Sequence, residues 1–303
     1  MSIIRFLLVP ALLALQFVSS PAVAQVKVVA SFSILGDLVQ NVGGERVEVT
    51  LLVGPDTDLH VYQPSPADAK RLLDARLVVI NGLGLEGWAD RLVKASGFKG
   101  RTVVASRGIK AKAAAKHGHG HGGKPHAHSR NDPHSWQDVA NVKIYVANIR
   151  DALIAADARG KSYYEAAASA YLTQLDALDA EIKAIFAGIP NPRRRVITSH
   201  EAFAYYSGAY DITFLAAQGV GGNTEPSAKG IATLIRQIKR EGVKAIFIEN
   251  ISNPRVIQRV AKETGAAIGG TLYSDALSDA GGPAPTYITM MQHNTRLLAN
   301  AMK

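Results

Sequence analysis

The sequence predicts an α/β protein of two parallel-sheet lobes joined by one long rigid helix, and three observations lead to this prediction. From Val26 onward, short β-branched runs alternate with amphipathic stretches, as in proteins built from strand and helix units. The amphipathic stretch at residues 162–186 would form a helix roughly 37 Å long at 1.5 Å per residue, which is enough to bridge two lobes. The chain of 303 residues is also longer than one average domain.

The first lobe is expected at residues 25–160, interrupted by a histidine-rich loop at residues 116–130. Ser65 and Pro66 supply the N-cap and the first-turn proline of one of its helices. Its strands are expected at residues 26–30, 47–53, 77–80 and 102–105. Its helices are expected at residues 34–42, 66–73, 85–95 and 138–156.

The linking helix is expected at residues 161–187 and the second lobe at residues 188–303. A break at Pro190-Asn191-Pro192 separates them, and the two lobes show no repeat of obvious sequence identity. The strands of the second lobe are expected at residues 195–198, 211–215, 245–248 and 267–272. Its helices are expected at residues 200–207, 227–241, 254–264 and 286–302.

Residues 1–24 have the pattern of a cleaved secretory signal, with Arg5 ahead of an apolar run and Ala22-Val23-Ala24 as the cleavage pattern. The apolar run is shorter than the roughly 20 residues that span a bilayer, and no later segment is as apolar. The chain has no cysteine, which removes the lipid-accepting residue of a lipoprotein, disulfide bonds and thiolate metal ligands. We therefore expect a soluble exported protein.

The distribution of the basic residues argues against nucleic-acid binding. The net charge of +9 falls to +8 when Arg5 leaves with the signal, and the basic residues are dispersed. The one tight run, Arg193-Arg194-Arg195, lacks interleaved aromatic residues and is interpreted as a solvated face.

A histidine tract carries five of the nine histidines, flanked by glycines. Imidazole is a common ligand of transition metals, and such a tract has no apolar residues to bury. We expect a mobile loop that collects metal at weak auxiliary sites, because glycine-rich flanks cannot preorganise a tight one. The tract histidines are His117, His119, His121, His126 and His128.

Four other residues, His60, His134, His200 and Asp275, lie in loops beside predicted strand ends or helix starts, two in each lobe. Ligands of open α/β sheets bind beyond the carboxyl ends of the strands. Three imidazoles and one carboxylate satisfy tetrahedral Zn²⁺ in number and type. The sequence thus predicts one tight zinc site in the interlobe cleft, and four protein ligands leave no open position, which favours carriage over catalysis.

Several acidic residues near these positions have two interpretations. Asp275 could be a helix N-cap, in which case Asp279 or Glu201 could replace it as a ligand. Asp58 and Asp132, each two residues before a histidine, either orient the imidazole or form turns. A further histidine, His293, falls in the last predicted helix and is interpreted as a surface or packing residue.

The segment Gly82-Leu83-Gly84-Leu85-Glu86-Gly87 matches the glycine fingerprint of dinucleotide-binding folds. The acidic residue expected roughly 20 positions later, at the end of the next strand, is missing from residues 102–108. These glycines are therefore interpreted as a tight turn from strand to helix.

At these positions the chain resembles the metal-binding periplasmic proteins of ABC importers, the cluster A-I solute-binding proteins, and within them the zinc-specific type that includes ZnuA and AztC. The resemblance covers essentially all of the mature chain. It rests on His60-Val61-Tyr62-Gln63-Pro64-Ser65-Pro66, Gly84-Leu85-Glu86-Gly87-Trp88, Asn131-Asp132-Pro133-His134-Ser135-Trp136, Ser199-His200-Glu201-Ala202-Phe203, Glu225-Pro226-Ser227 and Gly281-Gly282 through Met291.

The resemblance implies a periplasmic monomer whose lobes move little when metal leaves and which delivers metal to a membrane permease. It places the metal ligands on His60, His134, His200 and Asp275. Manganese-binding relatives have a glutamate where this chain has His200, so the match favours zinc. Two departures are Leu59, where the family usually has proline, and the missing cysteines of the disulfide that some zinc members form.

The leading functional hypothesis is therefore a zinc carrier, not an enzyme, whose partners are an ABC permease and a periplasmic metallochaperone that donates metal. A manganese-binding or adhesin-type protein of the same fold is one alternative. A zinc hydrolase is another, in which three histidines hold the ion and Asp275 or Glu201 acts as base.

Overall fold

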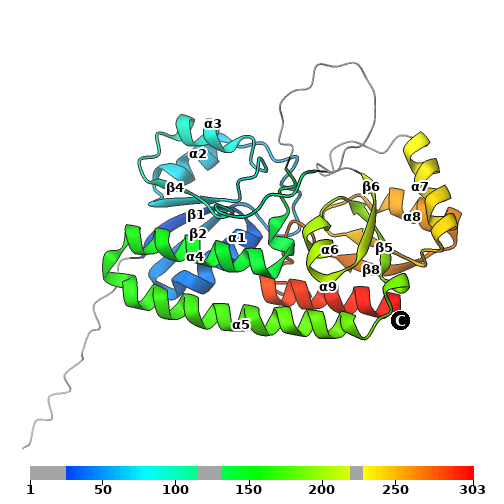
Figure 1. Ribbon diagram of the computed structural model, residues 1–303. Coiled ribbons are helices and arrows are strands. Elements are labelled where there is room, and N and C mark those ends of the chain that lie inside the picture. The colour runs from blue at the N-terminus through cyan, green and yellow to red at the C-terminus, as the bar shows by residue number, and fades with distance from the viewer. Residues whose placement is uncertain (1–24, 115–130, 219–227) are drawn as a thin grey trace, which may run out of the picture.

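The computed structural model of the protein describes residues 25–114, 131–218 and 228–303. The expected signal segment and the five tract histidines lie outside these residues. Two lobes lie side by side, and one long helix runs beneath both (Figure 1). The prediction of two parallel-sheet α/β lobes joined by a long helix is confirmed.

The first lobe is built on a parallel sheet with the strand order β2-β1-β3-β4. The central strand β1 pairs through Val28 with Val49 on one side and Leu77 on the other. The strands are β1 (Val26–Phe32), β2 (Val47–Val53), β3 (Leu77–Ile80) and β4 (Arg101–Val104). The helices are α1 (Ser33–Gly43), α2 (Pro66–Leu73), α3 (Ala89–Ser96) and α4 (Val139–Ala156).

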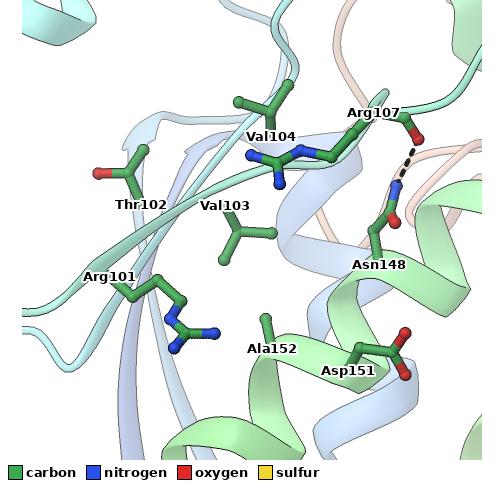
Figure 2. Close-up of a pocket in the computed structure, with 8 residues that line it drawn as sticks. All are labelled: Arg101, Thr102, Val103, Val104, Arg107, Asn148, Asp151 and Ala152. Atoms are coloured by element: carbon green, nitrogen blue, oxygen red, sulfur yellow. Dashed lines mark hydrogen bonds between the residues drawn. The ribbon is translucent and has the colours of Figure 1, made fainter.

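A surface pocket of about 270 Å³ lies between the edge strand β4 and helix α4 (Figure 2). Arg101 and Arg107 line it, and Asn148 Nδ2 donates a hydrogen bond of 2.9 Å to the Arg107 carbonyl. Among the described residues that line the pocket, Asp151 is the one carboxylate and there is no histidine, and guanidinium groups do not bind cations. This pocket is therefore not a candidate metal site.

The second lobe repeats the same topology, with the strand order β6-β5-β7-β8 and all pairs parallel. The edge strands are β2 and β4 in the first sheet and β6 and β8 in the second. The strands are β5 (Arg195–His200), β6 (Thr213–Gln218), β7 (Ala245–Glu249) and β8 (Ala267–Leu272). The helices are α6 (Ala204–Tyr210), α7 (Ala228–Glu241), α8 (Pro254–Thr264) and α9 (Tyr287–Met302).

Helix α5 (Lys161–Ala187) connects the lobes. It packs against α4 of the first lobe and α9 of the second (Figure 1). One face of α5 is buried along its whole length at helical spacing, because both lobes cover it. The buried residues are Tyr164, Ala168, Tyr171, Leu175, Leu178, Ile182 and Phe186. Short 3₁₀ turns are found at Gly44–Arg46, Ser135–Gln137, Ala158–Gly160 and Asn191–Arg193.

Two predicted helix starts were wrong. Helix α3 begins at Ala89 and not at residue 85, because residues 85–88 form a bend and a turn. The Leu85 N–H donates to the Gly82 carbonyl at 3.1 Å and the Ala89 N–H donates to the Glu86 carbonyl at 3.0 Å, which are turn contacts and not the i to i+4 bonds of an α-helix. Helix α6 begins at Ala204 and not at residue 200, because β5 extends through His200.

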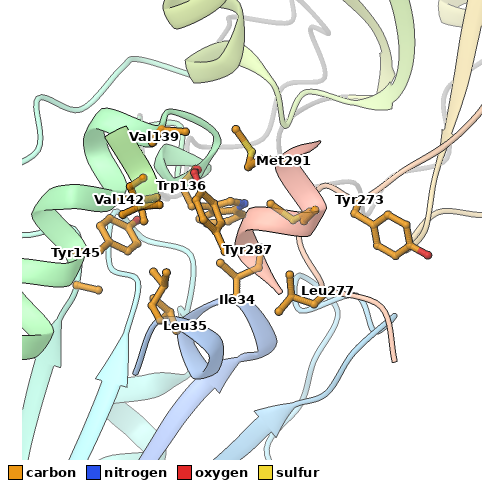
Figure 3. Packing of buried hydrophobic residues seen from close by; sticks show 14 of the residues in the cluster. Ile34, Leu35, Trp136, Val139, Val142, Tyr145, Tyr273, Leu277, Tyr287 and Met291 are labelled. Carbon is orange, nitrogen blue, oxygen red and sulfur yellow. The ribbon is translucent and has the colours of Figure 1, made fainter. Parts of the chain in front are cut away.

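One hydrophobic cluster runs through both lobes and α5. At its centre, Ile34 and Trp136 of the first lobe meet Leu277, Tyr287 and Met291 of the second (Figure 3). Trp136 and Tyr287 are fully buried, and the Tyr287 hydroxyl donates a hydrogen bond of 2.8 Å to the Trp136 carbonyl. The lobes are therefore joined by a shared core as well as by the linking helix.

A search of the described helices for one that is both long and apolar enough to cross a membrane found none.

Candidate metal centre

The four residues predicted from strand ends come together between the lobes. One ligand atom from each of His60, His134, His200 and Asp275 lies within 4.8 Å of the others. His60 lies in the loop between β2 and α2, and His134 lies just before the first turn that leads into α4. His200 is the last residue of β5, and Asp275 follows β8. The parallel sheets thus bring together residues more than 200 positions apart.

The carboxylate of Asp275 faces the Nε2 atoms of all three histidines. Its Oδ2 lies 3.0 Å from His200 Nε2 and 3.2 Å from His60 Nε2, and its Oδ1 lies 3.5 Å from His134 Nε2. His134 Nε2 and His60 Nε2 are 3.3 Å apart. Ligand atoms at about 2.0–2.1 Å from a tetrahedral Zn²⁺ are roughly 3.3 Å from one another. The spacing of these atoms therefore suits one four-coordinate ion.

The centre is nearly closed to solvent. His134, His200 and Asp275 are fully buried, whereas His60 is partly buried with 7% of its side chain exposed. His60 also lines a pocket of about 870 Å³ on the first lobe, together with Tyr62 and Trp88. Because His60 is the only one of the four with solvent access, it forms the outer side of the centre.

The loop that carries His60 is fixed at several points. The Asp58 carboxylate accepts a hydrogen bond of 2.8 Å from the His60 backbone N–H. Leu59, which stands where a proline was expected, is 1% exposed and packs into the core. Asp56, with a φ of 49°, donates its N–H to the Leu277 carbonyl of the other lobe. Asp58 therefore forms a turn before His60. The buried side chain of Leu59 holds this loop in the hydrophobic core.

Asp132 orients the imidazole of His134. Its Oδ1 accepts from the His134 backbone N–H at 2.9 Å and lies 2.7 Å from His134 Nδ1. A carboxylate at Nδ1 favours the tautomer that carries the proton there and leaves the Nε2 lone pair for a cation. Both interpretations of Asp132 therefore hold: its backbone contact forms a turn, as Asp58 does, and its contact with Nδ1 orients the imidazole.

Glu249 occupies the equivalent place behind His200, and the sequence analysis missed it. Its Oε1 accepts from the His200 backbone N–H at 2.9 Å, and its Oε2 lies 2.6 Å from His200 Nδ1. Its position in the sheet could have indicated this role, because Glu249 is the last residue of β7 and β7 lies beside β5.

The loop that carries Asp275 is bound to the first lobe. Trp136 Nε1 and Gln137 Nε2 each donate a hydrogen bond of 2.8 Å to the carbonyl of Ser274. The two residues considered as replacements for Asp275 are outside the four-residue cluster: Asp279 is exposed, and Glu201 lines a pocket of about 250 Å³ that His200 also lines. His293 also lies outside the cluster, with its Nε2 at 3.0 Å from the Thr271 carbonyl.

The charges of the centre are strongly coupled. Burial alone would lower the pKa of His200, but Glu249 and Asp275 outweigh it and hold that pKa well above its usual value. Burial alone would raise the pKa of Asp275, but His134 and His200 outweigh it and hold that pKa well below its usual value. Without a metal, the centre therefore keeps a proton in the place where a divalent cation would balance the same carboxylates.

Comparison with known proteins gives consistent matches over most of the chain. The profile of the family described as zinc-uptake complex component A, periplasmic (ZnuA) matches residues 28–301. The manganese-binding lipoprotein MntA of Halalkalibacterium halodurans is 35% identical over 268 residues, covering 88% of this chain and 85% of that protein.

Two solved structures are also similar. The periplasmic zinc binding protein TroA from Treponema pallidum matches with a TM-score of 0.84 and 28% identity, over 92% of this chain and 99% of that one. The Mn-bound periplasmic metal binding protein from Candidatus Liberibacter asiaticus matches with a TM-score of 0.79 and 29% identity, over 92% of this chain and 100% of that one. All three of these proteins are described as metal-binding, and the family consists of solute-binding proteins of ABC metal importers, which are not enzymes. With its fold, its buried cluster of three histidines and an aspartate, and a family match from residue 28 to residue 301, the chain belongs to the ZnuA family of periplasmic metal-binding proteins of ABC importers.

Proposed function

We propose that this protein captures Zn²⁺ in the periplasm through His60, His134, His200 and Asp275 and delivers it to an ABC permease. The observation that carries the proposal is the donor set, three imidazole nitrogens and one carboxylate around a single point. Zinc favours four ligands of this kind, whereas Mn²⁺ favours more ligands and more oxygen among them. Membership of the family supports import of a metal, and the donor set supports zinc.

Manganese is the second candidate because relatives of this chain bind it by name. MntA is described as manganese-binding, and one similar structure holds manganese, whereas TroA is described as zinc binding. Similarity alone therefore leaves both metals open. The third imidazole, His200, is the feature that favours zinc over manganese here.

Carriage follows from the way the centre is closed. Four protein ligands would fill a tetrahedral ion, leaving no position for a substrate or an activated water. Three of the four side chains are fully buried. A centre of this kind holds an ion until the surrounding loops change, which suits transfer to a permease and its ATPase.

The remaining parts of the chain are assigned to the same task. Residues 1–24 are proposed to be a signal removed on export, residues 25–160 and 188–303 to be the two lobes, and residues 161–187 to be the link between them. The histidine tract is proposed to collect metal, or to receive it from a metallochaperone, at weak auxiliary sites. Removing residues 116–128 should leave one tight site and abolish the weaker ones, as counted by calorimetric titration of Zn²⁺. Loss of the tight site would contradict this division.

The proposal is tested by titrating Zn²⁺ and Mn²⁺ separately into metal-free protein and into the double variant His60→Ala, His200→Ala. We expect the wild type to bind one Zn²⁺ tightly, with weaker binding of Mn²⁺, and the double variant to lose the tight site. Tight Zn²⁺ binding that survives in the double variant would place the site elsewhere. Tighter binding of Mn²⁺ than of Zn²⁺ would favour the second candidate.

A further inference from the structure

We propose that Glu249 is a positioning residue of the metal centre, which holds His200 in the one orientation and tautomer that can bind a cation through Nε2. This inference rests on the proposed metal site and names a residue outside the ligand set. Glu249 touches no metal ligand atom of the four-residue cluster directly, so its effect on metal must act through His200.

The sheet brings the two residues together. Strands β5 and β7 are parallel neighbours, so their carboxyl ends lie at the same edge. His200 is the last residue of β5 and Glu249 is the last residue of β7. Both side chains are fully buried, where a carboxylate is costly unless it is paired. Glu249 is therefore held opposite His200 by the strands themselves.

The carboxylate contacts His200 at two points with two different oxygens. Oε1 accepts from the backbone N–H at 2.9 Å, and Oε2 lies 2.6 Å from Nδ1 of the imidazole. The first contact is a hydrogen bond that fixes the main chain, and the second is a close ion-pair contact that holds the negative charge at the Nδ1 side of the ring, without hydrogen-bond geometry in the described structure. With the proton on Nδ1, the Nε2 lone pair faces Asp275, whose Oδ2 is 3.0 Å away.

Both contacts need an acceptor, and an amide cannot supply two. In Glu249→Gln, an amide oxygen facing the His200 N–H would leave the NH₂ group facing Nδ1. That NH₂ would take the Nδ1 lone pair and move the imidazole proton to Nε2, which blocks coordination. The reverse orientation would point NH₂ at the backbone N–H, so two donors would meet.

Asp132 provides a control because it also places a carboxylate at Nδ1 of a ligand histidine but uses its oxygens differently. A single oxygen, Oδ1, serves both the backbone N–H and Nδ1 of His134, while Oδ2 is buried without a hydrogen-bond partner in the described structure. In Asp132→Asn, the amide oxygen can therefore keep both contacts. Asp132→Asn removes the negative charge beside His134 but leaves the tautomer of His134 unchanged. Glu249→Gln removes the negative charge beside His200 and also changes the tautomer of His200.

The experiment measures Zn²⁺ affinity by competition with a chelator for the full chain and for E249Q and D132N, each with His200 intact and in a His200→Ala background. We expect E249Q to weaken Zn²⁺ binding by about 10- to 100-fold and D132N by less. In the His200→Ala background, the loss from E249Q should shrink to no more than the loss from D132N. Residues that act through one another show this non-additivity.

A spectroscopic readout separates positioning from general damage to the fold. In ¹⁵N-histidine spectra of the Zn²⁺-loaded protein, His200 should carry its proton on Nδ1, and E249Q should lose that signal. If E249Q does not fold, Glu249→Asp is measured in its place: its shorter carboxylate should give an intermediate loss of affinity with the Nδ1 proton retained. Retention of full affinity in that variant would contradict the proposal.

The outcomes for the two proposals are distinct. If His200→Ala leaves Zn²⁺ affinity unchanged, the metal site itself is wrong. If His200→Ala weakens binding and E249Q does not, or if E249Q costs the same with and without His200, Glu249 is not a positioning residue while the site remains.

Discussion

Two buried imidazoles of the centre have a carboxylate at Nδ1, on the side of the ring away from Asp275. Asp132 lies at Nδ1 of His134 and Glu249 lies at Nδ1 of His200. Such partners raise the basicity of the ligand nitrogen and fix its direction. Glu249 and Asp275 also hold the pKa of His200 well above its usual value, so at the residue scale metal and proton compete for the lone pair of His200.

This competition predicts a pH dependence that runs through His200. Its pKa is held well above the usual value of 6.5, so below that raised pKa a bound Zn²⁺ must displace the proton. Zn²⁺ affinity should therefore fall as pH is lowered from about 8 to about 6, and less steeply in His200→Ala. Competition titrations at several pH values check this. Equal slopes in both proteins would show that His200 is not the group that exchanges the proton.

In the metal-free protein, His200 and Asp275 make the stability of the fold depend on pH in opposite directions. Because the folded pKa of His200 is raised, its contribution to stability is present at low pH and is lost as pH rises through that pKa. Because the folded pKa of Asp275 is lowered, its contribution is lost as pH falls below the usual value of 3.8. The pair stabilises the metal-free fold between these limits.

At the scale of helices and strands, contacts between the first and the second lobe hold the metal centre together. Helix α1 meets the start of α9 where Asp37 Oδ2 accepts the N–H of Tyr287 at 2.9 Å. Burial raises the pKa of Asp37 to about 6, against the opposing effect of that hydrogen bond. The stability of the α1–α9 contact should therefore depend on pH.

Asp37→Asn tests this contact. Since the folded pKa lies above the usual 3.8, the folded state favours the protonated carboxyl, and this stabilisation is lost as pH rises from about 4 to about 6. The asparagine keeps an acceptor for Tyr287 N–H without the buried charge. We expect the variant to melt at a higher temperature than wild type near pH 8 and to show little difference near pH 4. If the melting temperatures of the two proteins changed with pH in the same way, Asp37 would not be the group responsible.

Helix α5 should contribute to the stability of both lobes at once. Leu175 is fully buried in the cluster that both lobes share, whereas Leu172 is only partly buried. Leu175→Ala should lower the free energy of unfolding by about 2–5 kcal/mol, and Leu172→Ala should lower it by less. Urea unfolding followed by fluorescence measures both, and Trp136 provides a probe in the core. Equal costs for the two variants would mean that α5 does not pack as described.

Elements with a strong hydrophobic period could be predicted from the sequence nearly to the residue. The bounds of α2, α8, β2 and β8 agree with the predicted ranges, because caps, prolines and glycines mark their ends. The start of α3 could not be predicted, since the turn at residues 85–88 includes Glu86, whose carboxylate accepts hydrogen bonds from Ser31 and from the Asn81 N–H, and such contacts leave no local pattern in the sequence. Glu249 was missed for a similar reason: an acidic residue ending a buried strand has no periodic signal, and its partner lies 49 positions away.

At the scale of the whole molecule, the two lobes behave as one body. They share a hydrophobic core and are joined by hydrogen bonds from Trp136 to Ser274 and from Asp56 to Leu277. Separating them would expose that core and break buried hydrogen bonds. Metal capture should therefore rely on local movement of the loops around the centre.

Small-angle X-ray scattering can measure this directly. The radius of gyration should be the same, within error, for metal-free and Zn²⁺-loaded protein, because the shared core prevents a wide opening of the lobes. A clear decrease on adding Zn²⁺ would indicate hinge closure and contradict the rigid two-lobe account.

The central claim is that one ion is held by three imidazoles and one carboxylate. Zinc K-edge X-ray absorption of the protein loaded with one equivalent of Zn²⁺ tests it most directly. The account predicts four nitrogen or oxygen ligands at about 2.0–2.1 Å, with the outer-shell scattering of three imidazole rings. Five or six ligands dominated by oxygen, or scattering from fewer than three imidazoles, would contradict it.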